Sequence, residues 1–144
     1  MNNKFKEEFK KLNAEKIKYI INRCAEHDFL EINKNSNNSF IKYIDDDEYG
    51  YWVVEWGYKK IPYNNMFLGC GYFENSIIIK PFKIEFKINN KALYPFNTNG
   101  KKQLEDYLFV YINNQCPHYK QAIIEETEKF IKFLDTDNQG ENTL

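Results

Sequence analysis

The feature that most constrains the fold is a strict alternation of apolar and charged residues between Phe82 and Ile88. Every even position in this run is apolar, and the odd positions hold Lys83, Glu85 and Lys87. Successive side chains of a β-strand point to opposite faces, so this segment places one face on a core and the other in water. Strands with one solvated face are typical of antiparallel sheets, because helices cover both faces of most parallel sheets. The run therefore predicts an antiparallel sheet.

A second segment, Tyr51 to Tyr58, follows the same two-residue period with larger side chains. Trp52 and Trp56 fall on one face, and Tyr51 and Glu55 fall on the other. Shorter apolar runs bounded by turn residues add candidate strands at residues 29–32, 40–44, 66–73, 77–80 and 91–96. Of these, 66–73 and 77–80 are interpreted as a hairpin that turns across residues 74–76.

Helices are predicted on both sides of the strand region. Residues 4–26, 101–113 and 117–134 carry apolar side chains at three- and four-residue spacing, which is the pattern of an amphipathic helix. We therefore expect an α+β fold, in which one N-terminal helix and two C-terminal helices pack on a central twisted antiparallel sheet of about five or six strands. A chain of 144 residues is normally one domain, here residues 1–135, and the polar residues 136–144 are expected to form a flexible tail.

The sequence favours a cytoplasmic protein without a membrane segment. The first residues are charged and lack the apolar core of a secretory signal, and no run approaches the roughly 20 apolar residues that cross a bilayer. The three cysteines, Cys24, Cys70 and Cys116, are odd in number and far apart. This spacing favours reduced thiols over a disulfide framework.

No residue set predicts catalysis, a metal site or a cofactor. His27 and His118 are the two histidines, and no Cys-x-x-Cys occurs, so ligands for a metal are scarce. Cys70 lies between two glycines, but its surroundings are typical of a strand with a bulge or bend rather than of a nucleophile at a strand-to-helix turn. Arg23 is the one arginine, and arginine supplies the commonest specific base contact, so we expect no nucleic-acid binding.

The surface that best fits a partner is an acidic turn followed by an aromatic strand. The outward residues of this segment combine carboxylates with tyrosines. Tyrosine is favoured at interfaces because it brings a large rigid ring and a polar tip, and carboxylates steer a basic partner. The candidate partner contacts are Asp45, Asp46, Asp47, Glu48, Tyr49, Tyr51 and Glu55. The alternative interpretation is that helices cover both faces of the strand and leave only a solvated turn.

A small domain with an acidic aromatic patch and no evident active site resembles the bacterial immunity proteins that neutralise a cognate toxin. The abundance of Asn, Lys and Ile and the scarcity of arginine also resemble the products of AT-rich bacterial genomes. The resemblance implies a stoichiometric inhibitor that binds a toxin domain, here a basic one. It rests on class-level features, and no family residues are carried over.

Two other functions stay open from the sequence. The sheet and helices can enclose an aromatic-lined pocket that binds or processes a small apolar molecule, with candidate residues Trp52, Trp56, Phe67, Cys70 and Tyr72. Self-association as a structural protein is the third possibility.

Overall fold

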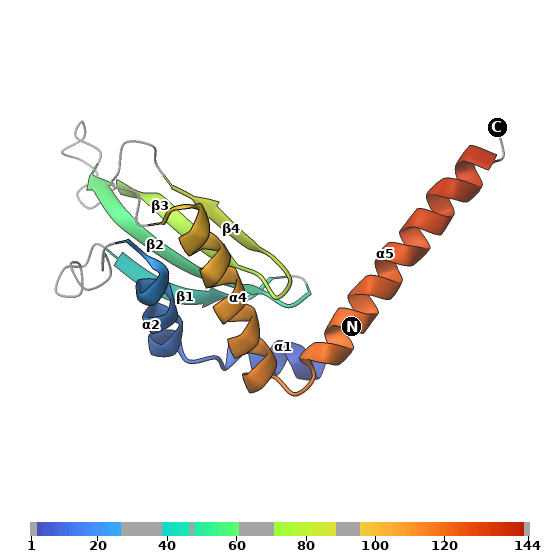
Figure 1. Ribbon diagram of the computed structural model, residues 1–144, viewed down its shortest axis with the longest axis horizontal. Coiled ribbons are helices and arrows are strands. Elements are labelled where there is room, and N and C mark those ends of the chain that lie inside the picture. The colour runs from blue at the N-terminus through green and yellow to red at the C-terminus, as the bar shows by residue number, and fades with distance from the viewer. Residues whose placement is uncertain (1–2, 27–38, 47, 61–70, 89–95, 143–144) are drawn as a thin grey trace.

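The centre of the molecule is a four-stranded antiparallel sheet (Figure 1). The computed structural model describes residues 3–26, 39–46, 48–60, 71–88 and 96–142. Within them the strands are β1 (Ser39–Ile44), β2 (Tyr51–Lys60), β3 (Gly71–Ile79) and β4 (Ile84–Lys87), which pair in sequence order. The α+β class and the antiparallel sheet are confirmed, whereas the strands among these residues number four rather than five or six.

The strand register explains the alternation seen in the sequence. Trp52 lies opposite Ile79, and Val54 lies opposite Ile77, so these side chains share one face of the sheet. All four are buried. Ile84 of β4 pairs with Ile79 and extends the same apolar face. This face therefore forms the sheet side of the core.

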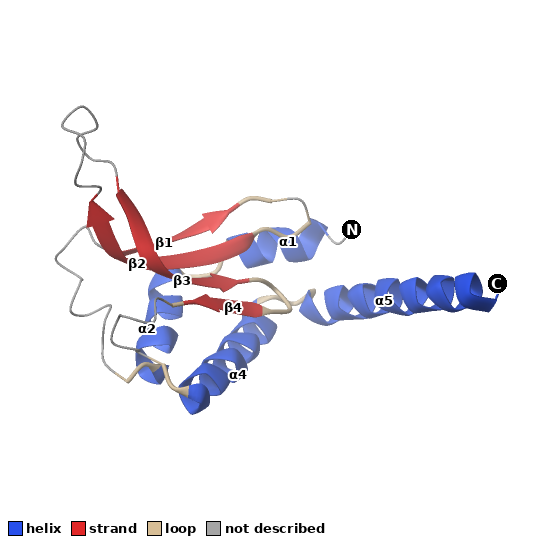
Figure 2. Cartoon of the chain, turned by 90° about the horizontal axis from the view of Figure 1, so that it is seen from above, coloured by secondary structure: helices blue, strands red, loops and turns tan. Residues whose placement is uncertain are grey.

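Helices cover this apolar face, and no helix of the described residues covers the opposite face of the sheet (Figure 2). The covering helices are α1 (Asn3–Lys10), α2 (Ala14–Cys24) and α4 (Thr98–Gln115). Their apolar stripes join the sheet in one cluster, and Phe5, Ile21 and Leu104 within it are fully buried. The stripe predicted for residues 101–113 is confirmed in α4.

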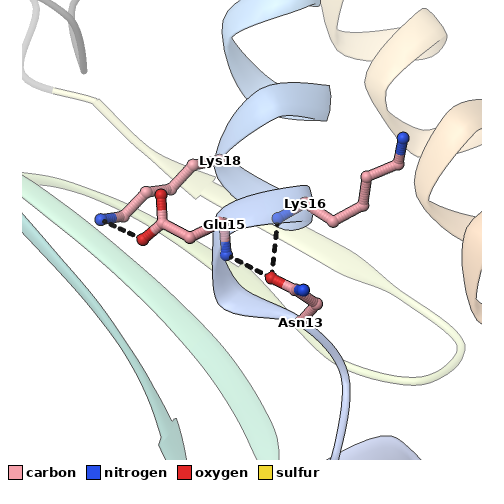
Figure 3. A network of polar contacts seen from close by, with 4 residues as sticks. All are labelled: Asn13, Glu15, Lys16 and Lys18. Carbon is pink, nitrogen blue, oxygen red and sulfur yellow. Dashed lines mark hydrogen bonds and ion pairs between the residues drawn. The ribbon is translucent and has the colours of Figure 1, made fainter.

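The single N-terminal helix expected over residues 4–26 is divided into two. Asn13 ends the connection between α1 and α2, because its side-chain oxygen accepts hydrogen bonds from the backbone N–H groups of Glu15 (2.9 Å) and Lys16 (3.2 Å) (Figure 3). Such an N-cap satisfies donors that the first turn of a helix leaves without partners. Lys18 adds an ion pair with Glu15 at 3.4 Å.

The hairpin predicted across residues 74–76 is also wrong, because β3 runs straight through them. The polar side chains that suggested a turn have partners within the sheet instead. Glu74 pairs with Lys59 of β2 at 2.9 Å, and the amide of the buried Asn75 donates to the Trp56 carbonyl at 3.5 Å. The strands predicted at 29–32 and, almost entirely, at 91–96 lie outside the described residues.

The last helix, α5 (Tyr119–Asn142), packs on the body only at its base and then projects away from it (Figure 1). Among the residues of this helix whose burial is described, Tyr119 and Ala122 are buried. Only one of the two C-terminal helices therefore lies along the sheet, contrary to expectation. The segment from residue 136, expected to be a flexible tail, continues this helix as far as Asn142.

Candidate functional site

The acidic turn connects β1 to β2 and is shaped by Gly50. Gly50 has a φ of +71°, a backbone conformation that side chains with a Cβ rarely adopt. The Tyr43 hydroxyl passes close to Gly50 and donates a 2.8 Å hydrogen bond to the Tyr49 carbonyl. Asp45, Asp46 and Glu48 are exposed on this turn, and Asp47 lies outside the described residues.

Two carboxylates of the turn pair with lysines of the same chain. Lys6 of α1 lies 2.8 Å from Asp45, and Lys129 of α5 lies 3.2 Å from Glu48. The hydrogen bond from Lys6 lowers the pKa of Asp45, and the pKa of Lys6 rises because of the same bond. These pairs reduce the negative field that the turn presents and connect it to the first and last helices.

The aromatic residues of the predicted patch separate into two environments. Tyr51 and Glu55 are half-buried and lie on the face of β2 that no described helix covers (Figure 2). Tyr49 belongs to the core, because its side chain is only 5% exposed and its ring packs on Phe5 (5.3 Å) and Phe82 (5.7 Å). The ring is therefore buried, whereas the sequence had predicted an exposed contact surface at Tyr49.

A pocket of about 260 Å³ adjoins the turn. It lies where the β1–β2 connection and the β3–β4 turn meet the base of α5. Its walls combine aromatic rings with charged side chains. The lining residues are Asp46, Glu48, Tyr49, Gly50, Tyr51, Lys80, Pro81, Phe82, Lys83 and Glu126. The pocket therefore includes four of the seven predicted contact residues and adds Glu126, which sequence reasoning missed.

Two polar atoms of this lining are buried without a hydrogen-bond partner among the described residues: the Tyr49 hydroxyl and Oε2 of Glu126. Lys129 approaches that Glu126 oxygen only to 3.9 Å. Burial raises the pKa of Tyr49, and the charges of Lys129 and Glu126 also act on its hydroxyl. Buried polar atoms normally have partners, so the pocket offers two acceptor atoms to a donor from outside.

One carboxylate forms ion pairs with both lysines of the pocket wall. Glu85 of β4 lies 3.2 Å from Lys80 and 3.8 Å from Lys83. The hydrogen bond from Lys80 lowers the pKa of Glu85. The lysines are thereby held beside their own counter-ion, and Asp46, Glu48 and Glu126 contribute acidic groups to the same lining.

The alternative aromatic pocket is not assembled by the residues proposed for it. Trp52 and Trp56 are core side chains with 6% and 5% exposure, and the Trp52 indole donates to the Phe9 carbonyl at 3.0 Å. Tyr72 is 54% exposed. Phe67 and Cys70 lie outside the described residues. The two tryptophans fill the interior instead of lining a cavity for a ligand.

A cluster at the start of α5 could not be found from the sequence, because its members are more than 100 positions apart. Glu8 of α1 accepts hydrogen bonds from the His118 backbone N–H (3.0 Å) and contacts His118 Nδ1 (2.7 Å). Burial raises the pKa of the neighbouring Cys116 thiol to about 12, so the thiol is protonated and poorly nucleophilic. The cluster holds the base of α5 in place.

The described residues contain no group of three or more potential metal ligands. None of their helices is long and apolar enough to cross a membrane. Comparisons with protein-family models, curated proteins and solved structures gave no match for this chain.

Proposed function

We propose that this chain is a non-enzymatic protein-binding module, and specifically a cytoplasmic immunity protein that binds and neutralises a basic toxin domain. The proposed docking surface consists of the pocket at the acidic turn and the adjoining helix-free face of β2. The observation that carries the proposal is the pair of buried acceptor atoms in the pocket, the Tyr49 hydroxyl and Glu126 Oε2.

A lysine or arginine side chain of a partner fits the chemistry of the pocket. Its apolar stem can lie against Tyr51 and Phe82, and its N–H groups can donate to Glu126. Hydrogen bonds between a cationic donor and a carboxylate are roughly twice as strong as neutral ones. Arginine in particular offers five donors in a rigid fork, so one side chain can donate to more than one acceptor of the pocket.

The helix-free face extends the contact beyond one pocket. A single pocket of about 260 Å³ is too small for a stable protein–protein interface, which typically buries 1,200–2,000 Å² in total. Tyr51 and Glu55 continue the surface along β2, where Tyr51 lies opposite Ile44 and Glu55 lies opposite Phe40 of β1. The Glu55 carboxylate attracts a basic partner during association, and the Tyr51 ring anchors that partner once it is bound.

The test is a binding measurement with the secreted toxin domain that the proposed function requires, encoded beside this chain. The variant Glu126→Gln keeps the shape of the pocket and removes its charge. We expect it to bind at least ten-fold more weakly, mainly through faster dissociation, because it alters a buried contact. The matched control Glu128→Gln, on an exposed residue of the same helix, should bind like the wild type.

A second variant tests the steering surface. Glu55→Lys should slow association at low salt, with a smaller effect at high salt where charges are screened. Equal affinities for wild type and Glu126→Gln would reject the pocket as the docking site. A chain that neither binds the neighbouring toxin nor protects cells from it would reject the function.

A further inference from the structure

The pocket beside the acidic turn has a cation of this chain at its edge. Lys129 of α5 is half-exposed, and its Nζ lies 3.2 Å from Glu48 and 3.9 Å from Glu126. Both glutamates line the pocket. The hydrogen bond to Glu48 raises the pKa of Lys129, and the charge of Glu126 adds to this effect, so the ammonium group is charged at neutral pH. A cation that enters the pocket from outside therefore meets carboxylates that already have a partner.

Lys129 satisfies only part of this site. Its ammonium group donates a hydrogen bond to Glu48, but the 3.9 Å to Glu126 Oε2 exceeds hydrogen-bond distance. That oxygen and the hydroxyl of Tyr49 are buried without a hydrogen-bond partner among the described residues. Tyr49 is 5% exposed and lines the pocket. The site therefore holds a cation and still contains two buried polar atoms that lack a partner.

The lysines of the pocket wall have a different partner. Lys80 and Lys83 lie 3.2 Å and 3.8 Å from Glu85 of β4. Lys129, by contrast, contacts two carboxylates of the lining itself. A cation that binds Glu48 or Glu126 therefore competes with Lys129 rather than with the wall lysines.

We propose that Lys129 neutralises the acidic side of the pocket in the free protein and is displaced when the guanidinium group of an arginine on the protein partner binds there. The inference rests on the proposed function, because it concerns the same pocket and the same partner. Lys129 thus acts as an internal competitor, which lowers the affinity of the pocket for a cation from outside. Its displacement also breaks the ion pair that joins α5 to the acidic turn.

A guanidinium group gains contacts that Lys129 does not make. It offers five N–H donors, whereas an ammonium group offers three. Because the single nitrogen of Lys129 approaches both Glu48 and Glu126, a wider group with more donors reaches both from the same place. The rings of Tyr51 and Phe82 in the lining offer faces on which a guanidinium group stacks. A partner's lysine brings only the kind of group that Lys129 already supplies, so we expect arginine to bind more tightly.

The strength of the competition follows from the exposure of the ion pair. The side chains of Lys129 and Glu48 are 51% and 49% exposed, and an ion pair this exposed is formed only a few times more often than it is broken. Its removal should therefore raise the affinity for an arginine side chain roughly two- to six-fold. Since every cation must displace the same group, the removal should leave the preference between two cations unchanged.

The test titrates the full chain with N-acetyl-arginine amide and N-acetyl-lysine amide, whose blocked ends imitate a residue within a protein, and follows the backbone amide signals by NMR. The wild type should bind the arginine probe in the millimolar range, as expected for a ligand of this size, and the lysine probe about ten-fold more weakly. Lys129→Gln should bind both probes roughly two- to six-fold more tightly. The matched control Lys132→Gln removes the same charge from an exposed position of α5 and should bind like the wild type.

A second variant at the same position should act in the opposite direction. Lys129→Arg places a guanidinium group on the chain itself, where it makes the contacts expected of the partner, so this variant should bind the arginine probe more weakly than the wild type. The side-chain signals of isotope-labelled lysine report the displacement directly. The Lys129 signal, identified by its absence from the spectrum of Lys129→Gln, should shift with the arginine probe in proportion to the amide signals of the pocket.

Five results would overturn the inference. Equal or weaker binding of the arginine probe by Lys129→Gln shows that Lys129 does not compete, and an equal gain in Lys132→Gln shows a general effect of charge. A Lys129 signal that stays still while the pocket signals shift shows binding without displacement. Equal affinity for the two probes, or no binding of either, rejects guanidinium as the occupant. Free arginine that binds more tightly than the blocked probe assigns the pocket to an amino acid instead of a protein.

These measurements use no toxin, so their failure and the failure of the proposed function are distinguishable. A chain that shows the expected probe affinities but binds no toxin has an arginine pocket for another protein. If the toxin binds through Glu126 and Lys129→Gln leaves the affinity for the arginine probe unchanged, only the displacement of Lys129 is rejected.

Discussion

Removing one hydroxyl group at the base of α5 should produce a stability difference that reverses sign with pH. Tyr119 is 6% exposed, and its hydroxyl donates a 2.8 Å hydrogen bond to the Pro81 carbonyl. Its ring stacks on Phe82 at 6.0 Å. The substitution Tyr119→Phe keeps the ring and deletes the hydrogen bond. At pH 7 we expect a loss of about 1 kcal/mol in the free energy of unfolding, the usual net value of such a bond.

At alkaline pH the Tyr119 hydroxyl lowers the stability of the wild type. Burial raises the pKa of Tyr119 from 10 to about 12, with a smaller contribution from Cys116. The unfolded chain therefore loses the phenol proton at lower pH than the folded chain, and the stability of the wild type falls as pH rises above 10. This loss is about 1 kcal/mol at pH 11 and approaches about 3 kcal/mol well above pH 12, since one pKa unit equals 1.36 kcal/mol.

The two effects cancel near pH 11. Urea unfolding of wild type and Tyr119→Phe between pH 7 and 11.5 should show the wild type more stable at neutral pH and less stable at the alkaline end. Burial also raises the pKa values of Tyr43, Tyr49 and Cys116, but these groups are present in both proteins and largely drop out of the difference. A difference that stays constant from pH 9 to 11.5 would refute the reasoning. Tyr19→Phe, at a 55% exposed position, should match the wild type throughout.

Two further substitutions test the local features that define the fold. Asn13→Ala should lower the free energy of unfolding by about 1 kcal/mol, because α2 loses its N-cap; Asn13→Asp keeps an acceptor and should stay within about 0.5 kcal/mol of the wild type in the same urea titration. Gly57→Ala should cost about 1–3 kcal/mol, because Gly57 has a φ of +75° and a Cβ there would lie 2.6 Å from the buried Asn75 amide. A thermal midpoint equal to that of the wild type would contradict the second expectation.

The elements that the sequence predicted well are those that depend on local pattern. The two-residue period of Tyr51–Tyr58 correctly placed Trp52 and Trp56 on the core face. The helical stripe through Leu104 and Leu108 was equally informative, and both residues are buried in α4. In each case the periodicity of the backbone imposes the burial pattern directly, so neighbouring residues carry enough information.

The features that the sequence did not reveal depend on contacts between distant residues. Glu74 and Asn75 suggested a turn because polar residues usually bound strands, yet Lys59 and the Trp56 carbonyl satisfy them within the sheet. The acidic turn likewise gave no sign that Lys6 and Lys129 would pair with two of its carboxylates. A pattern predicts that a side chain is polar but does not identify the group that will neutralise it.

The exposed apolar side chains of α5 are a second case in which a sequence pattern does not identify the contact. Their periodicity predicted a helix with one buried face, and the helix is present, but periodicity does not specify what buries that face. The base of α5 is fixed by Tyr119 to Pro81 and by His118 to Glu8. These contacts direct the helix outward, so the apolar side chains from Ile123 onward cannot reach the chain's own sheet.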